Sequence, residues 1–372
     1  MKKTAEIAAA AVFIGFLALF SVLRLVFPAR EFSERENRFL EQRPAFTLSS
    51  LFSGEFTKRF ESYITDQFPF RDGWTTLKAR CELISGKREN NGVYYCSGAL
   101  ISRFETPSDD VIEENTSFIN TLAQNISCPV YFCLIPGAAE IEHDRLPPNA
   151  PCGSQADVIR KAFAACNARP VDMLDVLSEH SGEYIFYRTD HHWTSLGAYY
   201  GYTSLCGAMG LEAALLSDYD RQTVSESFYG TAYSSSGFSW VEPDSIETFV
   251  PDDGSVTITN YSTGEAASAS LYDESFLAVK DKYSFFLGGN TPRLSVDTGH
   301  VEKPKLCIIR DSYTDSLLPF LLDDFSRIDL IDLRYFKSSV SQYICDGGFD
   351  AVLVIYSVPN FSTDVNLFML AT

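Results

Sequence analysis

The sequence lacks the charge balance and the spacings that several classes of protein require. Its 30 lysine and arginine residues are outnumbered by 49 aspartate and glutamate residues, which gives a net charge of −19. Nucleic-acid binding needs a basic face to neutralise phosphates, so we expect no nucleic-acid partner. The chain has no glycine-rich phosphate loop and no dinucleotide fingerprint. It therefore offers no site for coenzyme A, and we expect no bound cofactor.

The nine cysteines show no CxxC spacing. Cys133 and Cys307 lie in apolar, strand-like runs, which favours buried thiols over bridge partners. The odd number leaves at least one cysteine without a partner inside the chain, and spacing assigns no bridge. Hydrophobic residues make up 45% of the chain, enough to bury a large core.

An apolar run from Ile7 to Leu23 follows Lys2 and Lys3, and it approaches the ~20 residues that a membrane-spanning helix needs. Positive charge before the run predicts that the N-terminus stays in the cytoplasm and the rest is exported. A cleaved signal peptide is the alternative. No small-x-small cleavage pattern follows the run before Pro28, which favours an uncleaved anchor.

We therefore predict three parts, a transmembrane anchor over residues 1–28, a charged stalk over residues 29–50 and an extracellular α/β domain over residues 51–372. Without the four charged residues of the anchor, 27 basic and 48 acidic residues remain, a net charge of −21. At the start of the domain an apolar residue recurs every four positions, which predicts one helix face that packs on the domain rather than on lipid. These residues are Phe56, Phe60 and Ile64.

Apolar runs of strand length alternate with helical patterns, which predicts a parallel sheet covered by helices on both faces. The predicted strands are 129–135, 184–187, 305–309, 327–333 and 350–356, and the predicted helices are 111–124, 156–167, 194–209, 314–325 and 338–345. Residues 211–300 break this rhythm with short strand patterns at 255–259, 270–272 and 283–287. We interpret them as a β-rich insertion that rims the active site.

Two motifs follow predicted strands and carry chemistry. Asp190 and His192 come after strand 184–187, and Ser312 comes after strand 305–309, where a helical pattern begins. Active sites of parallel sheets form beyond the carboxyl ends of the strands, so both motifs should meet at one edge. His192 would act as general base toward the Ser312 hydroxyl, and Asp190 would hold the imidazole tautomer.

Structural roles are the alternative for each of these residues. Asp190 and His192 also suit a hydrogen-bonding cluster that fixes a helix start, and Ser312 also suits a plain turn. Neighbouring side chains in extended backbone point to opposite faces, so His191 and His192 are poor ligands for one metal, and we expect none. A zinc or iron site that adds His143 is the metal-dependent alternative.

Five segments together resemble the DHHW family of bacterial surface proteins, relatives of the SGNH-like O-acetyltransferases that acetylate alginate. They are residues 32–38 (FSERENR), 66–72 (DQFPFRD), 190–193 (DHHW), 288–290 (GGN) and 310–312 (RDS). The resemblance runs from about residue 30 to the C-terminus and implies an SGNH-hydrolase-like fold. It also implies that the Asp-x-His motif precedes the serine, the reverse of ordinary SGNH hydrolases.

By this resemblance the catalytic residues are Ser312, His192 and Asp190. The activity implied is an O-acetyltransferase or acetylesterase that acts on a cell-surface or secreted polysaccharide, with a membrane-bound O-acyltransferase as acetyl donor partner. The alternative is a non-catalytic glycan-binding or polysaccharide-assembly protein that retains the fold.

Three further residues are candidates for oxyanion or substrate binding. Asn290 resembles the asparagine that donates to the oxyanion in SGNH enzymes, but it also suits a turn. Trp193 suits a wall of the site better than a platform for a sugar, and Tyr313 adjoins the nucleophile. Arg310 stands where the relatives usually carry glycine. If that glycine needs a positive φ, Arg310 predicts a strained backbone.

Overall fold

The computed structural model describes residues 2–251, 254–262 and 265–372, which form two compact units. The first unit contains Met1–Asn90 with Ser234–Ser239, and the second contains Asn91–Tyr233 with Trp240–Thr372. The predicted catalytic residues all belong to the second unit.

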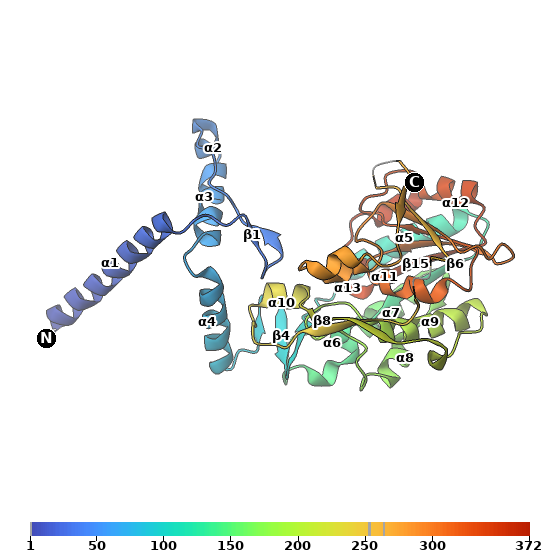
Figure 1. Cartoon of the computed structure of the whole chain (residues 1–372), viewed down its shortest axis with the longest axis horizontal. Helices are drawn as coiled ribbons and strands as arrows, with labels where there is room; N and C mark the ends of the chain where they lie inside the picture. The colour runs from blue at the N-terminus through green and yellow to red at the C-terminus, as the bar shows by residue number, and fades with distance from the viewer. Residues whose placement is uncertain (1, 252–253, 263–264) are drawn as a thin grey trace. The chain divides into compact units, whose positions relative to one another are not determined.

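The first unit begins with the long apolar helix α1 (Lys2–Val26), the blue helix at the N-terminus in Figure 1. Its segment Thr4–Val26, 23 residues, is long and apolar enough to cross a membrane. A signal sequence near the N-terminus has the same length and composition. Short strands and three helices follow: β1 (Phe32–Ser33), β2 (Arg38–Phe39), α2 (Leu48–Phe52), α3 (Glu55–Asp66) and α4 (Arg71–Ile84).

Ion pairs join the charged segments 32–38 and 66–72 of the first unit. Arg38 Nη2 lies 2.6 Å from Asp66 Oδ1, and Arg71 pairs with Glu36. Hydrogen bonding from Arg38 lowers the pKa of the Asp66 carboxyl. The segment 29–50 therefore folds back onto the junction between α3 and α4.

The apolar stripe of α3 is partly covered. The Phe56 ring stacks on Phe60 with centroids 5.6 Å apart and meets the edge of Phe46 at 5.2 Å. Phe60 and Ile64 each keep 41% of their surface exposed. The predicted helix is present, and the aromatic contacts of its stripe lie at the Phe56 end, against Phe46.

The second unit is built on a mixed sheet, and the predicted α/β fold is confirmed. Among the described residues, eight strands run in the order β11-β10-β12-β14-β13-β15-β6-β7. The five from β14 to β7 are parallel, and the other three extend the sheet in antiparallel fashion. Their bounds are β6 (Val130–Ile135), β7 (Arg169–Val171), β10 (Thr257–Asn260), β11 (Ala267–Ala269), β12 (Arg293–Asp297), β13 (Lys305–Arg310), β14 (Arg327–Ile331) and β15 (Ala351–Ser357). Two further antiparallel pairs are β4 (Val93–Cys96) with β5 (Ala99–Ser102) and β8 (Gln222–Phe228) with β9 (Asp244–Thr248).

Helices cover both faces of this sheet (Figure 1). On β13, Leu306 and Ile308 enter the core beneath α9, while Cys307 and Ile309 enter the opposite core. One face carries α8 (Leu174–Glu179), α9 (Ser195–Met209) and α11 (Thr314–Leu317), and the other carries α5 (Asp109–Asn125), α7 (Gln155–Ala165), α12 (Val340–Gly347) and α13 (Val358–Phe361). Because both faces are buried, the central strands are continuous apolar runs.

Several predicted elements of the second unit differ in the structure. Residues 283–287 were expected as a strand, but Tyr283–Phe285 lie on the 3₁₀ helix Lys282–Phe285, and Phe286 forms only an isolated bridge with Tyr272. A strand would send adjacent side chains to opposite faces, whereas Tyr283, Phe285 and Phe286 share one core cluster. The expected helix 314–325 is shorter, because α11 ends at Leu317 and a 3₁₀ turn with Pro319 follows. Proline has no N–H to continue the α-helical ladder.

Candidate functional site

Ser312 lies in the sharp turn between β13 and α11, at the carboxyl edge of the sheet. The Asp311 carboxylate holds this turn, because Oδ1 accepts the Tyr313 N–H at 3.1 Å and Oδ2 accepts the Ser357 N–H at 2.8 Å. The Asn360 side chain donates a third hydrogen bond to Oδ2, at 2.7 Å. Ser312 itself is only partly buried, so a substrate can approach its hydroxyl.

The segment that carries Asp190 and His192 is a closed turn rather than the end of a strand. Only a bridge between Phe186 and Trp193 pairs this segment, so the expected strand 184–187 is absent from the described residues. Thr194 caps α9 as predicted, since its side chain accepts the Gly197 N–H. The turn folds Asp190 and His192 toward each other instead of extending them apart.

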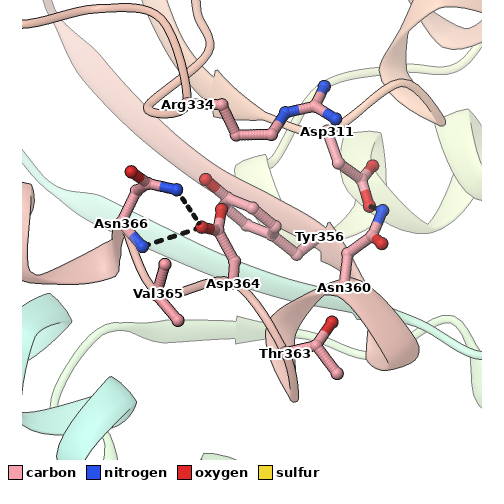
Figure 2. Close-up of a pocket in the computed structure, with 8 residues that line it drawn as sticks. All are labelled: Asp311, Arg334, Tyr356, Asn360, Thr363, Asp364, Val365 and Asn366. Carbon is pink, nitrogen blue, oxygen red and sulfur yellow. Dashed lines mark hydrogen bonds between the residues drawn. The ribbon is translucent and has the colours of Figure 1, made fainter. Parts of the chain in front are cut away.

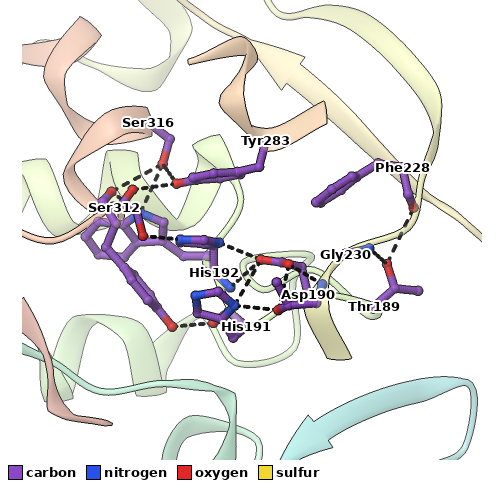
Figure 3. Close-up of polar contacts among 12 residues, drawn as sticks. Thr189, Asp190, His191, His192, Phe228, Gly230, Tyr283, Ser312 and Ser316 are labelled. Carbon is purple, nitrogen blue, oxygen red and sulfur yellow. Dashed lines mark hydrogen bonds and ion pairs between the residues drawn. The ribbon is translucent and has the colours of Figure 1, made fainter. Parts of the chain in front are cut away.

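A continuous chain of hydrogen bonds joins Asp190, His192 and Ser312 (Figure 3). His192 Nδ1 lies 2.5 Å from Asp190 Oδ1, and His192 Nε2 lies 2.7 Å from Ser312 Oγ. An ionised carboxylate only accepts, so Nδ1 donates and Nε2 is left to accept the serine O–H. This is the arrangement in which a histidine removes the proton of a nucleophilic serine.

The Asp190 carboxylate is held on both oxygens. Oδ1 also accepts the His192 N–H at 3.0 Å, and Oδ2 accepts the Thr231 N–H at 2.7 Å and its hydroxyl at 3.0 Å. Burial alone would raise the pKa of the Asp190 carboxyl, but the neighbouring His191 and His192 hold it well below its usual value. Asp190 therefore remains a carboxylate that can stabilise an imidazolium.

Gly230 packs against Asp190 where no side chain fits. A Cβ built at Gly230 would lie 2.2 Å from both Cβ and Oδ2 of Asp190. The Gly230 N–H donates to Thr189 Oγ1 at 3.1 Å, and that hydroxyl in turn donates to Asp244 at 2.5 Å. This backbone segment therefore fixes the outer side of the Asp190 carboxylate.

Tyr283 covers the other side of the site. Its ring stacks on the His192 imidazole with centroids 3.8 Å apart and an interplanar angle of 9°. Its hydroxyl donates to the Ser312 carbonyl oxygen at 3.1 Å and lies 3.3 Å from Ser316 Oγ. Tyr283 thus orients both the base and the turn that carries the serine.

The expectation that His191 and His192 point apart is wrong. Their ring centroids lie 3.9 Å apart, because the backbone turns here rather than running extended. His191 Nδ1 nevertheless meets Thr231 Oγ1 at 2.6 Å and not the serine. Partial burial and the neighbouring His192 lower the pKa of His191, although 37% of its side chain stays exposed.

Ligand atoms of Asp190, His191 and His192 lie within 4.8 Å of one another, a geometry that can hold a metal ion. His143 is not part of this group. Both ring nitrogens of His192 are already engaged by protein partners, as described above. A metal bound through His192 would have to break one of these hydrogen bonds.

Arg310 adopts an ordinary β conformation as the last residue of β13, paired in register with Ile355. It is absent from the positive-φ residues of the described chain, so the predicted strain does not arise. Its guanidinium is buried and lies 2.6 Å from Asp315 Oδ1. Burial raises the pKa of Asp315 to about 7, although Arg310 opposes the shift.

The three further candidates lie in different places. Trp193 is fully buried and donates from Nε1 to the Tyr313 carbonyl oxygen at 2.9 Å, so its ring belongs to the core. Tyr313 is also buried, and its hydroxyl donates to the His191 carbonyl oxygen. Asn290 is exposed, and its Oδ1 accepts from Arg334 at 3.0 Å. Among the described residues no hydrogen bond joins Asn290 to the triad, and its oxyanion role stays a prediction.

Sequence reasoning missed four residues that contact or support the triad: Gly230, Thr231, Tyr283 and Asp315. Gly230, Thr231 and Tyr283 reach the motif residues only through the tertiary fold, from segments at least 29 residues away along the chain. Asp315 lies only three residues after Ser312 and pairs with Arg310. The one available signal was the aromatic run that contains Tyr283, and it was interpreted as a strand.

Comparisons with known proteins agree with this architecture. The family model for DHHW protein matches residues 89–331. The chain is similar to a DHHW family protein from Eubacterium siraeum, with 27% identity, a TM-score of 0.65 and coverage of 76% of this chain and 95% of that one. It shares its fold with Bacillus cereus PatB1 carrying a sulfonyl adduct, with 19% identity, a TM-score of 0.64 and coverage of 75% and 98% respectively.

Comparison with curated proteins gives no match. The family match spans well over half of the 372 residues, and the α/β sheet has the SGNH-like form that the resemblance implied. The chain belongs to the DHHW family.

Proposed function

We propose that this protein is a membrane-anchored, extracellular O-acetyltransferase or acetylesterase that acts on a cell-surface or secreted polysaccharide. The single observation that carries the proposal is the unbroken hydrogen-bond chain from Asp190 through His192 to Ser312. The family resemblance suggests that the transferred group is acetyl and that the acceptor is a polysaccharide.

The reaction has two half-steps in this proposal. His192 Nε2 takes the Ser312 proton while Oγ attacks the acetyl carbonyl, and the leaving alcohol then receives that proton from His192. The product is an acetyl ester on Ser312. In the second half-step a sugar hydroxyl or water gives its proton to His192 and attacks this ester. The bond between the acetyl carbon and Ser312 Oγ breaks and His192 returns the proton to Oγ, which leaves the acetylated sugar, or acetate, and the free serine.

Asp190 contributes by holding the Nδ1 proton and by stabilising the imidazolium that forms in each half-step. Its buried position makes this electrostatic effect larger than it would be in water. Tyr283, stacked on the ring, limits rotation of the imidazole. Because these groups are already oriented, little further entropy is lost when the transition state forms.

A membrane anchor would hold the domain close to the bilayer, where we expect it to meet its substrate. The segment Thr4–Val26 has the length and apolarity of a membrane span, and we propose that it remains uncleaved with residues 29–372 outside the cell. A membrane-bound O-acyltransferase would then supply the acetyl group. Protease shaving of intact cells tests this topology, and protection of the domain until lysis would contradict it.

Hydrolysis of an aryl acetate by the full-length protein in detergent tests the chemistry. We expect Ser312→Ala to lower kcat by about 10³-fold or more, because the nucleophile is removed. Ser178→Ala, on the exposed side of α8, is the matched control and should match wild type. Equal turnover by wild type and Ser312→Ala would refute the proposal and favour the non-catalytic glycan-binding alternative.

A further inference from the structure

A cavity of about 250 Å³ opens at the carboxyl edge of the sheet, next to the turn that carries Ser312 (Figure 2). Asp311, the residue before Ser312, forms part of its wall. Arg334 enters from the chain that follows β14, and Tyr356 enters from β15. The cavity therefore adjoins the proposed nucleophile without containing it.

The cavity and the triad lie on opposite sides of the β13 end. The Asp311 side chain bonds to Ser357 and Asn360 at the start of α13, whereas Ser312 Oγ faces His192 before α9. Since α13 and α9 pack on opposite faces of the sheet, a long substrate laid across this edge would reach both places. A chain of sugars has that shape.

The charged groups of the wall are already paired with protein partners. Arg334 Nε and Nη2 donate to Asp332 at 2.9 and 2.6 Å. Asp364 Oδ1 accepts from the backbone and side chain of Asn366 at 2.8 and 2.7 Å. The wall carries Asp311, Asp364 and Arg334, and Asp332 pairs with Arg334, so negative charge exceeds positive charge around the cavity. An anionic ligand would be repelled, whereas a neutral polar ligand would not.

Tyr356 supplies an unused hydrogen-bonding group. Its side chain is 1% exposed, and its hydroxyl has no hydrogen-bond partner among the described residues. A buried polar group without a partner is costly, and such groups are few in native proteins. Tyr356 lines the cavity, but its oxygen exposes less than 1 Å², so a ligand hydroxyl becomes its partner only where the wall opens over it.

The size of the cavity limits the ligand. Pockets for drug-sized ligands measure ~300–1,000 Å³, so a volume of about 250 Å³ suits a single small ring. The hydroxyl of Thr363 and the amide of Asn360 add donors and acceptors to the same wall. Amide and hydroxyl groups beside the apolar side chain of Val365 form a lining that suits a sugar ring.

We propose that this cavity is a binding subsite for one neutral sugar residue of the polysaccharide. The neighbouring sugar residue receives the acetyl group from Ser312. The inference rests on the proposed function and adds to it the charge of the glycan. A uronate-rich polysaccharide is excluded as the preferred substrate. The subsite holds the glycan across the sheet edge while a neighbouring hydroxyl meets the acetyl-serine.

Binding is measured with full-length Ser312→Ala protein in detergent, so that no turnover occurs. The probes are immobilised glucose, mannose, galactose and N-acetylglucosamine tetrasaccharides, with tetragalacturonate as the anionic probe. Val365→Trp fills the cavity from an exposed position, since Val365 is 82% exposed and lines it. Val301→Trp is the matched control, because Val301 is 83% exposed and follows β12 at the opposite edge of the sheet.

We expect at least one neutral tetrasaccharide to bind more tightly than tetragalacturonate. Val365→Trp should abolish this binding and Val301→Trp should preserve it. Tyr356→Phe should weaken it about tenfold without lowering the thermal midpoint, because only the unpaired hydroxyl is lost.

Three results would overturn the subsite: no neutral probe bound, tetragalacturonate preferred, or binding unaffected by both Val365→Trp and Tyr356→Phe. Because binding is measured without turnover, these failures are separate from a failure of aryl acetate hydrolysis, which would overturn the proposed function instead.

Discussion

Gly230→Ala is the substitution that the geometry of the triad predicts most sharply. The added Cβ would lie 2.2 Å from the Cβ of Asp190, an atom fixed to the backbone that no rotamer change can move away. Ordinary van der Waals contact begins at 3.4 Å, so Asp190 must shift by about 1.2 Å. Asp190 would be displaced away from Gly230 together with its carboxylate.

This shift is large compared with a hydrogen bond. The distance of 2.5 Å between His192 Nδ1 and Asp190 Oδ1 would grow to as much as about 3.7 Å, beyond the ~3.2 Å limit of an N–H···O bond. Complete loss of the orienting carboxylate in a Ser-His-Asp triad costs about 10⁴ in kcat. A displaced but still charged Asp190 should cost less, about 10²–10³, or ~3–4 kcal/mol in the barrier.

The assay is steady-state hydrolysis of an aryl acetate, with thermal unfolding as a check on the fold. Overpacking should also lower the free energy of unfolding by about 1–3 kcal/mol. Gly182→Ala is the control, because a Cβ at Gly182 meets nothing within 4 Å. We expect the control to match wild type. A folded Gly230→Ala protein with unchanged kcat/KM would show that Asp190 does not orient the base.

Two further predictions concern residues around the triad. His192→Ala should lower kcat by about 10³-fold or more and His191→Ala by less than about tenfold, since only His192 contacts Ser312 Oγ; equal losses in folded variants would remove the role given to His192. Asp315 has a pKa of about 7 against its ordinary 3.8, so the folded state binds a proton that the unfolded state has released. Its contribution to stability is thus fully present below about pH 4 and is lost as the pH rises through about 7. Asp315→Asn should flatten this decline in chemical denaturation at several pH values, and an unchanged slope would contradict the shift.

The central strands and the capped helix were predictable because their signals are local. The strands β6, β13 and β15 are apolar runs buried on both faces, and Thr194 announces α9 through its own side-chain cap. Ser312 follows β13 at the carboxyl edge of the sheet, as the fold class predicts, whereas Asp190 and His192 reach that edge on a closed turn rather than after the predicted strand 184–187.

The failures arose where the chain turns. The conclusion that His191 and His192 diverge assumed extended backbone, but the bridge between Phe186 and Trp193 closes a loop there. Tyr283 was placed on a strand because consecutive aromatic residues favour strands, yet its ring is turned onto His192. Contacts of this kind depend on distant segments, and no local pattern encodes them.

The most direct test of the central claim is chemical labelling of Ser312. Full-length protein is treated with phenylmethylsulfonyl fluoride, a reagent suggested by the sulfonyl adduct in the PatB1 structure, and is then digested for mass spectrometry. A serine activated by His192 should be sulfonylated once, at Ser312, and His192→Ala should slow this reaction by about 10²-fold or more. No labelling of Ser312, or labelling that is equally fast in His192→Ala, would contradict the account.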